Sequence, residues 1–208
     1  PSPSDSLHSM KIAFTLLASV VAAEFLGYWI HTLLHSEKVK FLSKAHMHHH
    51  IFDYGPRHSQ RSDVYKDSGI GRFTLFGLGA EWLVPLVPVT IACVVLLHFL
   101  EVTLFLNLMS AATGLLWGYL MFSLVHRNFH VEGTWFLQTA FTRKWFRHVR
   151  RLHDIHHHKL TDEGRMPYNM GICFYWFDRL FGTYRPTLGR FNSRGLEKSR
   201  ELYAHLYK

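Results

Sequence analysis

Two long stretches of almost purely apolar sequence set the strongest limit on how this chain folds. Residues 12–34 are apolar except for Glu24, His31 and small polar residues, and residues 73–125 carry only three ionisable groups. About 20 consecutive apolar residues suffice for a helix to cross the roughly 30 Å hydrocarbon core of a bilayer. The first stretch therefore predicts one spanning helix. The second is too long for a single helix and predicts a pair, with a turn near residues 98–101.

These stretches leave two alternatives open. Lys11, the apolar run and the small residues at 20–23 also fit a secretory signal, although the run continues without a break through residues 28–30. A further partial or interfacial helix near residues 70–80 would raise the number of membrane helices from three to four. We expect residues 1–11 to be disordered, residues 12–185 to form one membrane domain and residues 186–208 to form a C-terminal tail.

The charged residues gather in two segments, 36–72 and 127–208, and the net charge is +8 with neutral histidines. One crossing leads into the first segment and a hairpin of two helices returns the chain to the same side. Basic segments next to spanning helices favour the cytoplasmic face of a membrane. The basic excess is therefore explained without nucleic acid, which we do not expect as a partner. Only two cysteines occur, with no CxxC pair, so no zinc ribbon or disulfide framework is predicted.

Ten of the 17 histidines fall into four clusters with helical spacing. The clusters are His31/His35, His46/His49/His50, His126/His130 and His153/His156/His157. Residues four apart lie on one face of a helix, whereas adjacent residues diverge by about 100°. An adjacent pair therefore suits two different metal ions. Two such sets, one from each half of the chain, predict four to five imidazoles for each of two metals.

The size of this set indicates which metal to expect. Neutral imidazole binds zinc, copper, iron and nickel. A structural zinc site needs four ligands and usually uses cysteine, so ten histidines favour a redox pair of iron ions with open positions for oxygen. Zinc or copper storage is an alternative. Within the two runs, His48 or His158 would replace a neighbouring ligand after a shift of register.

The order of the four clusters resembles the fatty acid hydroxylase and sterol desaturase superfamily. The segment Trp176-Phe177-Asp178-Arg179-Leu180-Phe181-Gly182-Thr183-Tyr184 and the triplet Asn169-Met170-Gly171 are similar to that family's ending. The resemblance covers residues 12–185. It implies an all-α integral membrane bundle of about three to four spanning helices, with a cytosolic His-rich helical cap that holds a di-metal site. It also implies oxygen-dependent hydroxylation or desaturation of a fatty acyl, sterol or related isoprenoid lipid.

Two departures from the family refine these expectations. Larger members carry an extra helix pair or a fused electron-carrier domain, and neither is present in this chain. Electrons would then come from a separate donor, either cytochrome b5-like or ferredoxin-type. Bacterial carotenoid hydroxylases are similar in size and layout, but their short motifs usually read HxxxxH, whereas both short motifs here read HxxxH. Zinc is expected to displace iron in some purified samples.

Beyond the ten ligands we expect no catalytic side chain. Asp154, Asp178 and Asn169 are candidates for groups that support the ligands; Asp154, inside the fourth cluster, would accept a ligand N–H. Glu24 lies within the first apolar stretch, where a carboxylate is either functional or bonded to a neighbouring helix. A non-catalytic metal-binding membrane protein is the alternative from another class. No residue separates hydroxylation from desaturation.

Overall fold

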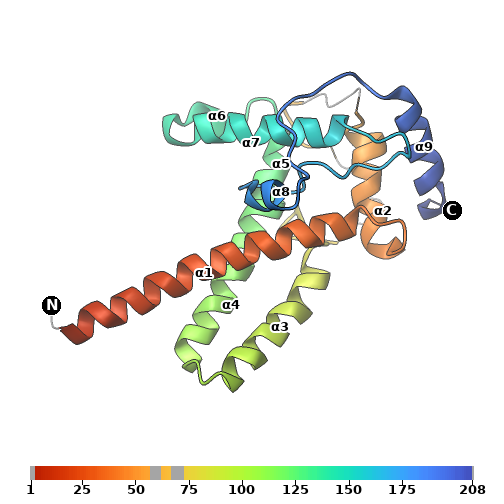
Figure 1. Cartoon of the computed structure of the whole chain (residues 1–208). Coiled ribbons are helices and arrows are strands. Elements are labelled where there is room, and N and C mark those ends of the chain that lie inside the picture. Colours follow the sequence, from red (N-terminus) through yellow and green to blue (C-terminus); the bar gives the residue numbers. More distant parts are fainter. Residues whose placement is uncertain (1–2, 57–61, 67–72, 208) are drawn as a thin grey trace.

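Helices make up most of the structure, a computed structural model that describes residues 3–56, 62–66 and 73–207 (Figure 1). The α-helices are α1 (Pro3–Leu34), α2 (Lys40–His48), α3 (Leu83–Phe99), α4 (Leu104–Gly118), α5 (His126–Phe129), α6 (Trp135–Gln138), α7 (Ala140–His158), α8 (Trp176–Leu180) and α9 (Ser193–Tyr203). The π-helical turns η1 (His49–Asp53) and η2 (Tyr119–Val125) continue α2 and α4, and a 3-10 turn, η3 (Ala204–Leu206), follows α9. The strands β1 (Thr74–Leu75) and β2 (Leu78–Gly79) pair antiparallel.

Two helical segments are long and apolar enough to span a membrane. They are Ser6–Leu34, which is most of α1, and Leu104–Phe129, which runs through α4, η2 and α5. Between them α3 is apolar but only 17 residues long, or about 26 Å at a rise of 1.5 Å per residue. The predicted hairpin is present, because α3 ends at Phe99 and α4 begins at Leu104. Among the described residues, the third predicted span therefore rests on a helix slightly shorter than the bilayer core.

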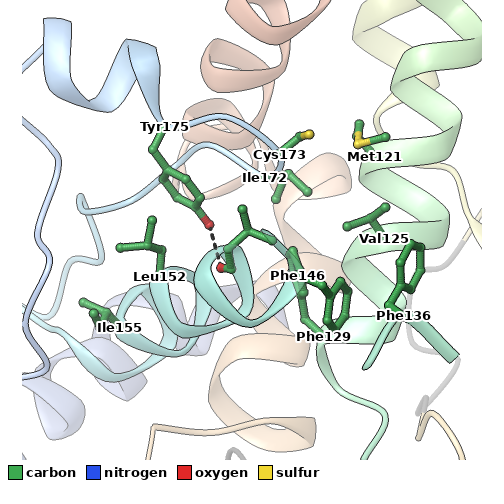
Figure 2. Close-up of a cluster of buried hydrophobic side chains, with 11 residues drawn as sticks. Met121, Val125, Phe129, Phe136, Phe146, Leu152, Ile155, Ile172, Cys173 and Tyr175 are labelled. Carbon is green, nitrogen blue, oxygen red and sulfur yellow. Dashed lines mark hydrogen bonds between the residues drawn. The ribbon is translucent and has the colours of Figure 1, made fainter. Parts of the chain in front are cut away.

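The remaining helices gather at one end of this framework. In Figure 1, α5 and α7 lie on the side of α1 opposite the turn of the α3–α4 hairpin, and α2 and α9 lie near and past the end of α1 that is away from the N-terminus. The amphipathic helix α7 organises this end, because its apolar face is buried and its basic face is exposed. Figure 2 shows Phe146 of α7 beside Phe129 of α5, with ring centroids 5.4 Å apart. The Tyr175 hydroxyl donates to the carbonyl of Val149, 3.2 Å away, and ties the 172–175 loop to the same helix.

Three segments differ from what the sequence led us to expect. Residues 74–79 form the β1–β2 hairpin in place of a helix near residues 70–80, of which residues 70–72 lie outside the described residues. The reversal is made by Phe76 and Gly77, both with positive φ, +50° and +73°, a backbone typical of tight hairpin turns. At the N-terminus α1 begins at Pro3, so residues 3–11 are helical. Helix formation is cooperative, and no helix breaker separates these residues from the apolar run.

The C-terminal segment is also folded rather than a loose tail. Residues of α9 and η3 pack against α2 and η1, where Tyr203 and Leu206 contact Met47 and Ile51 in one buried apolar cluster. Asn192 caps α9, since its side-chain oxygen accepts the N–H of Gly195 at 2.8 Å. Residues 193–206 therefore belong to the same packed unit as the His-rich helices.

Candidate metal centre

The ten histidines singled out by spacing come together in two groups of five. The first histidine group is His31, His35, His46, His50 and His156, and the second histidine group is His49, His126, His130, His153 and His157. Within each group, one ring nitrogen per residue lies within 4.8 Å of the others. The groups adjoin each other, because the rings of His50 and His157 stack with centroids 3.9 Å apart. Each group of buried imidazoles could hold a metal ion.

Each group is assembled by the same rule. It takes both histidines of one HxxxH cluster, the first and last of one HxxHH cluster and the middle histidine of the other HxxHH cluster. The adjacent residues His49 and His50 therefore serve different groups, and so do His156 and His157. This is the divergence that the spacing predicted. The π-helical turn η1 carries His49 and His50, and such turns are frequent at functional sites.

The nitrogen distances in the first histidine group fit a shared metal ion. Nε2 of His46 lies 3.1, 3.0 and 3.1 Å from Nε2 of His31, His35 and His50, respectively. One proton on His46 can bridge at most one of these contacts. Metal–imidazole bonds of about 2.0–2.1 Å place neighbouring ligand nitrogens about 3 Å apart at right angles. A cation among these nitrogens would therefore relieve contacts that protons leave unsatisfied.

The second histidine group shows related features. Nε2 of His153 lies 3.1 Å from Nε2 of His130. Nε2 of His49 is buried and has no hydrogen-bond partner among the described residues. A buried ring nitrogen without a partner is costly, and a metal ion would use its lone pair. The nitrogen atoms of both groups are therefore suitable ligands for a metal ion.

Backbone carbonyls fix the orientation of three of these rings. Nδ1 of His31 donates to the carbonyl of Met170 and Nδ1 of His156 to that of Tyr168, both at 2.6 Å. Nδ1 of His157 donates to the carbonyl of Tyr54 at 2.9 Å. A proton held on Nδ1 leaves the lone pair of Nε2 directed into the group, as metal-binding histidines require. These rings are therefore set in the ligand tautomer by the fold itself.

Burial keeps the imidazoles uncharged. Desolvation lowers the pKa well below its usual value, and repulsion between neighbouring imidazolium charges lowers it further. This holds for His35, His46, His49, His50, His153 and His156. Neutral imidazole is the form that binds a metal ion. The environment thus favours the ligating state near neutral pH.

Two of the three predicted supporting residues act through the backbone. The Asp178 carboxylate accepts the N–H groups of Met170 and Gly171 at 2.7 and 2.8 Å, and the Thr183 hydroxyl at 2.7 Å. Asn169, at φ +54°, spans two segments by donating to the carbonyls of Leu152 and Arg185. Both hold the loop whose Met170 carbonyl accepts His31. Asp154 is half-buried on α7, and its contact with a ligand stays a prediction.

His48 and His158, the alternative ligands within the two runs, make other contacts. Nδ1 of His48 lies 3.3 Å from an Asp53 carboxylate oxygen, and Nδ1 of His158 lies 3.4 Å from the carbonyl of Pro56. Neither belongs to a histidine group. In the structure, the other histidines of both runs are the ones that join the groups, and their role as ligands stays a prediction. Glu24, within the spanning part of α1, accepts N–H groups from Trp117 and Phe174 at 2.7 and 3.2 Å, so it joins helices and loop.

Sequence reasoning missed the groups that hold the rings. The carbonyls of Met170, Tyr168 and Tyr54 carry no side-chain signal. Tyr203 was also missed, although its buried hydroxyl donates to the carbonyl of His35 at 2.7 Å. A tyrosine on the apolar face of the short amphipathic segment 193–203 was the available signal.

A cleft gives access to both groups. It contains about 700 Å³ of empty space, part of it open to the outside, and His31, His46, His49 and His126 line it. Its other walls include the apolar side chains of Leu34 in α1, Trp82 just before α3, and Phe122 in η2. Trp82 is fixed there, since its indole N–H donates to the Ser123 hydroxyl at 2.9 Å. The cleft therefore brings apolar side chains next to the histidines, with the charged residues Glu81 and Arg127 also in its lining.

Comparison with known proteins agrees with this geometry. Residues 72–183 match the family model "Fatty acid hydroxylase". No curated protein and no solved structure matches the chain. The matched part is more than half of the chain and includes the third and fourth histidine clusters, while the first two clusters precede it. The chain therefore belongs to the fatty acid hydroxylase family, within the fatty acid hydroxylase and sterol desaturase superfamily.

Proposed function

We propose that this protein is a membrane di-iron oxygenase that hydroxylates a C–H bond of a lipid. The observation that carries the proposal is the pair of five-histidine groups, side by side and facing one cleft. Family membership supports an oxidoreductase acting on lipids. Two iron ions held by the histidine groups would supply the activation of O2 and the oxidation of the C–H bond.

The chain's own residues would bind the metal ions, orient the lipid and limit the access of water. The imidazoles would hold the ions through Nε2, and the carbonyls of Met170, Tyr168 and Tyr54 keep the rings aimed. Eight of the ten histidines are buried and two are half-buried, which limits water at the site. The apolar wall of the cleft would place the lipid chain beside the groups. Orientation of this kind lowers the entropic part of the barrier.

Desaturation of the same lipid, or hydroxylation of a carotenoid, would use the same site. Both differ from the proposal in the product rather than in the ligands. Product analysis of membranes that contain the active protein separates the three outcomes by mass: an added oxygen on a saturated lipid, a loss of two hydrogens, or an added oxygen on a polyene.

The proposed reaction also needs a source of electrons on one side of the membrane. We infer a separate electron donor, cytochrome b5-like or ferredoxin-type, that docks on the cytoplasmic side. Support comes from the exposed basic face of α7, which carries Arg143, Lys144, Arg147 and Arg151. A basic surface suits an acidic protein and also the cytoplasmic leaflet.

The decisive experiment combines metal analysis with oxygen uptake. Protein purified in lipid nanodiscs is expected to hold about two iron ions per chain, and reduced protein should take up oxygen only with a lipid substrate. His126→Ala should hold about one iron ion per chain, in the first histidine group, and should lose oxygen uptake. His148→Ala is a matched control, because His148 is exposed on α7 and outside both groups. Stably bound zinc with no oxygen uptake, after iron reconstitution and full reduction, would indicate a non-catalytic metal-binding protein instead.

A further inference from the structure

A second cavity lies within the apolar helices, away from the histidines. It contains about 460 Å³ of empty space between α1, α3 and α4 and is partly open at the side. Most of its lining is apolar or small, including Leu26 and Leu86 at the end nearer to the histidines. Asn107, in the first turn of α4, lies at the opposite end. About 19 residues separate Asn107 from His126 along the helix, or about 28 Å.

Asn107 carries a buried acceptor that nothing in the described protein satisfies. The residue is 2% exposed, and its Oδ1 has no hydrogen-bond partner among the described residues. Its Nδ2 donates to the carbonyl of Val94 at 2.9 Å. The amide orientation is therefore fixed, because the carbonyl of Val94 can pair only with the NH2 end. An unpaired amide oxygen within an apolar helical bundle costs free energy.

The hydroxyls of Ser19 and Ser110 have no hydrogen left to give. The Ser19 hydroxyl donates to the carbonyl of Thr15 at 2.7 Å. In the 2.8 Å pair between Ser19 and Ser110, the hydrogen must then come from Ser110. Both serines line the cavity with Asn107. This end of the cavity thus offers acceptors, and an occupant has to bring the donor.

We propose that this cavity binds a lipid that bears a hydroxyl group, with the hydroxyl donating to Oδ1 of Asn107 and the hydrocarbon lying along the apolar wall toward Leu26 and Leu86. A hydroxyl supplies the missing donor and an alkyl or ring system fills the remainder. A bulk acyl chain would fill the space and leave Oδ1 unpaired. The proposal concerns a site separate from the metal centre and does not depend on the metal.

Photoaffinity competition tests this directly. A diazirine-bearing 16-carbon alcohol is crosslinked to the protein in phosphatidylcholine nanodiscs, and the labelled peptides of α3 and α4 are identified by mass spectrometry. Unlabelled hexadecan-1-ol should compete at about fivefold lower concentration than its methyl ether, in which a methyl group replaces the donor hydrogen; fivefold corresponds to one hydrogen bond of about 1 kcal/mol. In Asn107→Leu the alcohol and the ether should compete equally. Ser110→Ala should keep the preference for the alcohol, since it leaves Oδ1 of Asn107 in place.

Equal competition in the wild type would overturn the proposal and leave the cavity to acyl chains or to a water on Asn107. That comparison needs no variant, so misfolding of Asn107→Leu would not blur it. The same measurement on His126→Ala protein, stripped of metal with a chelator, should give the same ratio. Failure of this site and failure of the proposed oxygenase activity are therefore seen separately.

Discussion

The two histidine groups use the same combination of sequence clusters but are held by different parts of the chain. In the first group, His31 and His156 donate to carbonyls of the 168–170 loop, and that loop is fixed in turn by Asp178. In the second group, His157 donates to the carbonyl of Tyr54, and Nδ1 of His49 lies 3.4 Å from the Tyr65 hydroxyl. The C-terminal segment reaches the first group through the Tyr203 hydroxyl, which donates to the carbonyl of His35.

This difference shows that one sequence rule can produce two sites with unequal support. The first group depends on residues 168–183 and on a helix that follows them. The second depends on the segment just after α2. Changes in the two supporting regions should therefore affect the two proposed metal ions separately.

The largest expected effect comes from replacing one or the other of two adjacent ligands by alanine. His156→Ala should remove the ion of the first group and His157→Ala that of the second, because these adjacent residues belong to different groups. Each variant should retain about one iron per chain and lose oxygen uptake. The fall in metal affinity should exceed the about 10–100-fold typical of losing an outer partner. Elemental analysis after chelator challenge measures it.

His158→Ala provides the matched control for that pair. His158 is the last residue of the same helix but lies outside both groups, so two irons and full oxygen uptake should remain. Loss of both ions in either single ligand variant would contradict two separable groups. An effect of His158→Ala equal to that of His157→Ala would indicate a different register.

Asp178→Asn should come next, and it should act on the first group. The variant places an NH2 group where two backbone N–H donors now meet a carboxylate. Hydrogen bonds to a buried charged group are worth about 1.5–3 kcal/mol each, so we expect a loss of several kcal/mol in unfolding free energy. The Met170 carbonyl should shift and weaken the first ion by about 10–100-fold.

Chelator kinetics and thermal unfolding together test this expectation. Glu201→Gln is a suitable control, because Glu201 pairs with Lys198 on the exposed face of α9. The informative result is whether the variant weakens only the ion of the first group. Equal loss of both ions in Asp178→Asn would show that the 168–171 loop supports the whole centre.

The site was more predictable from the sequence than its supports were. A spacing of four residues along a helix places His31 beside His35 and His126 beside His130 in any tertiary arrangement. The ten candidates could therefore be found by spacing alone. The separation of His49 and His50 into different groups was also expected, because the side chains of adjacent residues on a helix point in different directions. The anchoring carbonyls were not, since every residue has one and only tertiary packing selects Met170 or Tyr54.

The fold was predictable where a pattern was long. The apolar stretch of α1 and the α3–α4 hairpin follow from length and composition. The β1–β2 hairpin was missed because a short apolar run between turns fits helix and strand equally, and Phe76 gives no sign of its positive φ. The C-terminal helix α9 was missed as part of the site because its contacts reach back to α2, some 150 residues earlier in the chain.

Tyr203→Phe should have a smaller effect, again confined to the first group. It deletes the hydroxyl that donates to the His35 carbonyl and should cost about 1 kcal/mol of unfolding free energy. The first ion should dissociate several times faster, while the second should be unchanged. Tyr207→Phe is the matched control, because the buried Tyr207 hydroxyl has no hydrogen-bond partner among the described residues. Equal effects of the two variants would rule out a specific role for the Tyr203 hydroxyl.

The smallest effect is expected at the exposed ion pair of Glu37 and Arg165, which lines a pocket together with His35 of the first group. Arg165 donates to both carboxylate oxygens of Glu37 at 2.9 and 2.7 Å, just beyond His35. The Arg165 side chain is 51% exposed, and exposed pairs contribute only about 0–1 kcal/mol. Arg165→Gln should therefore lower the unfolding midpoint slightly, with the shift shrinking further in high salt. Unchanged metal content would place the support of the first group in the buried contacts of Asp178 and Tyr203, whereas loss of the first ion would extend that support to the surface.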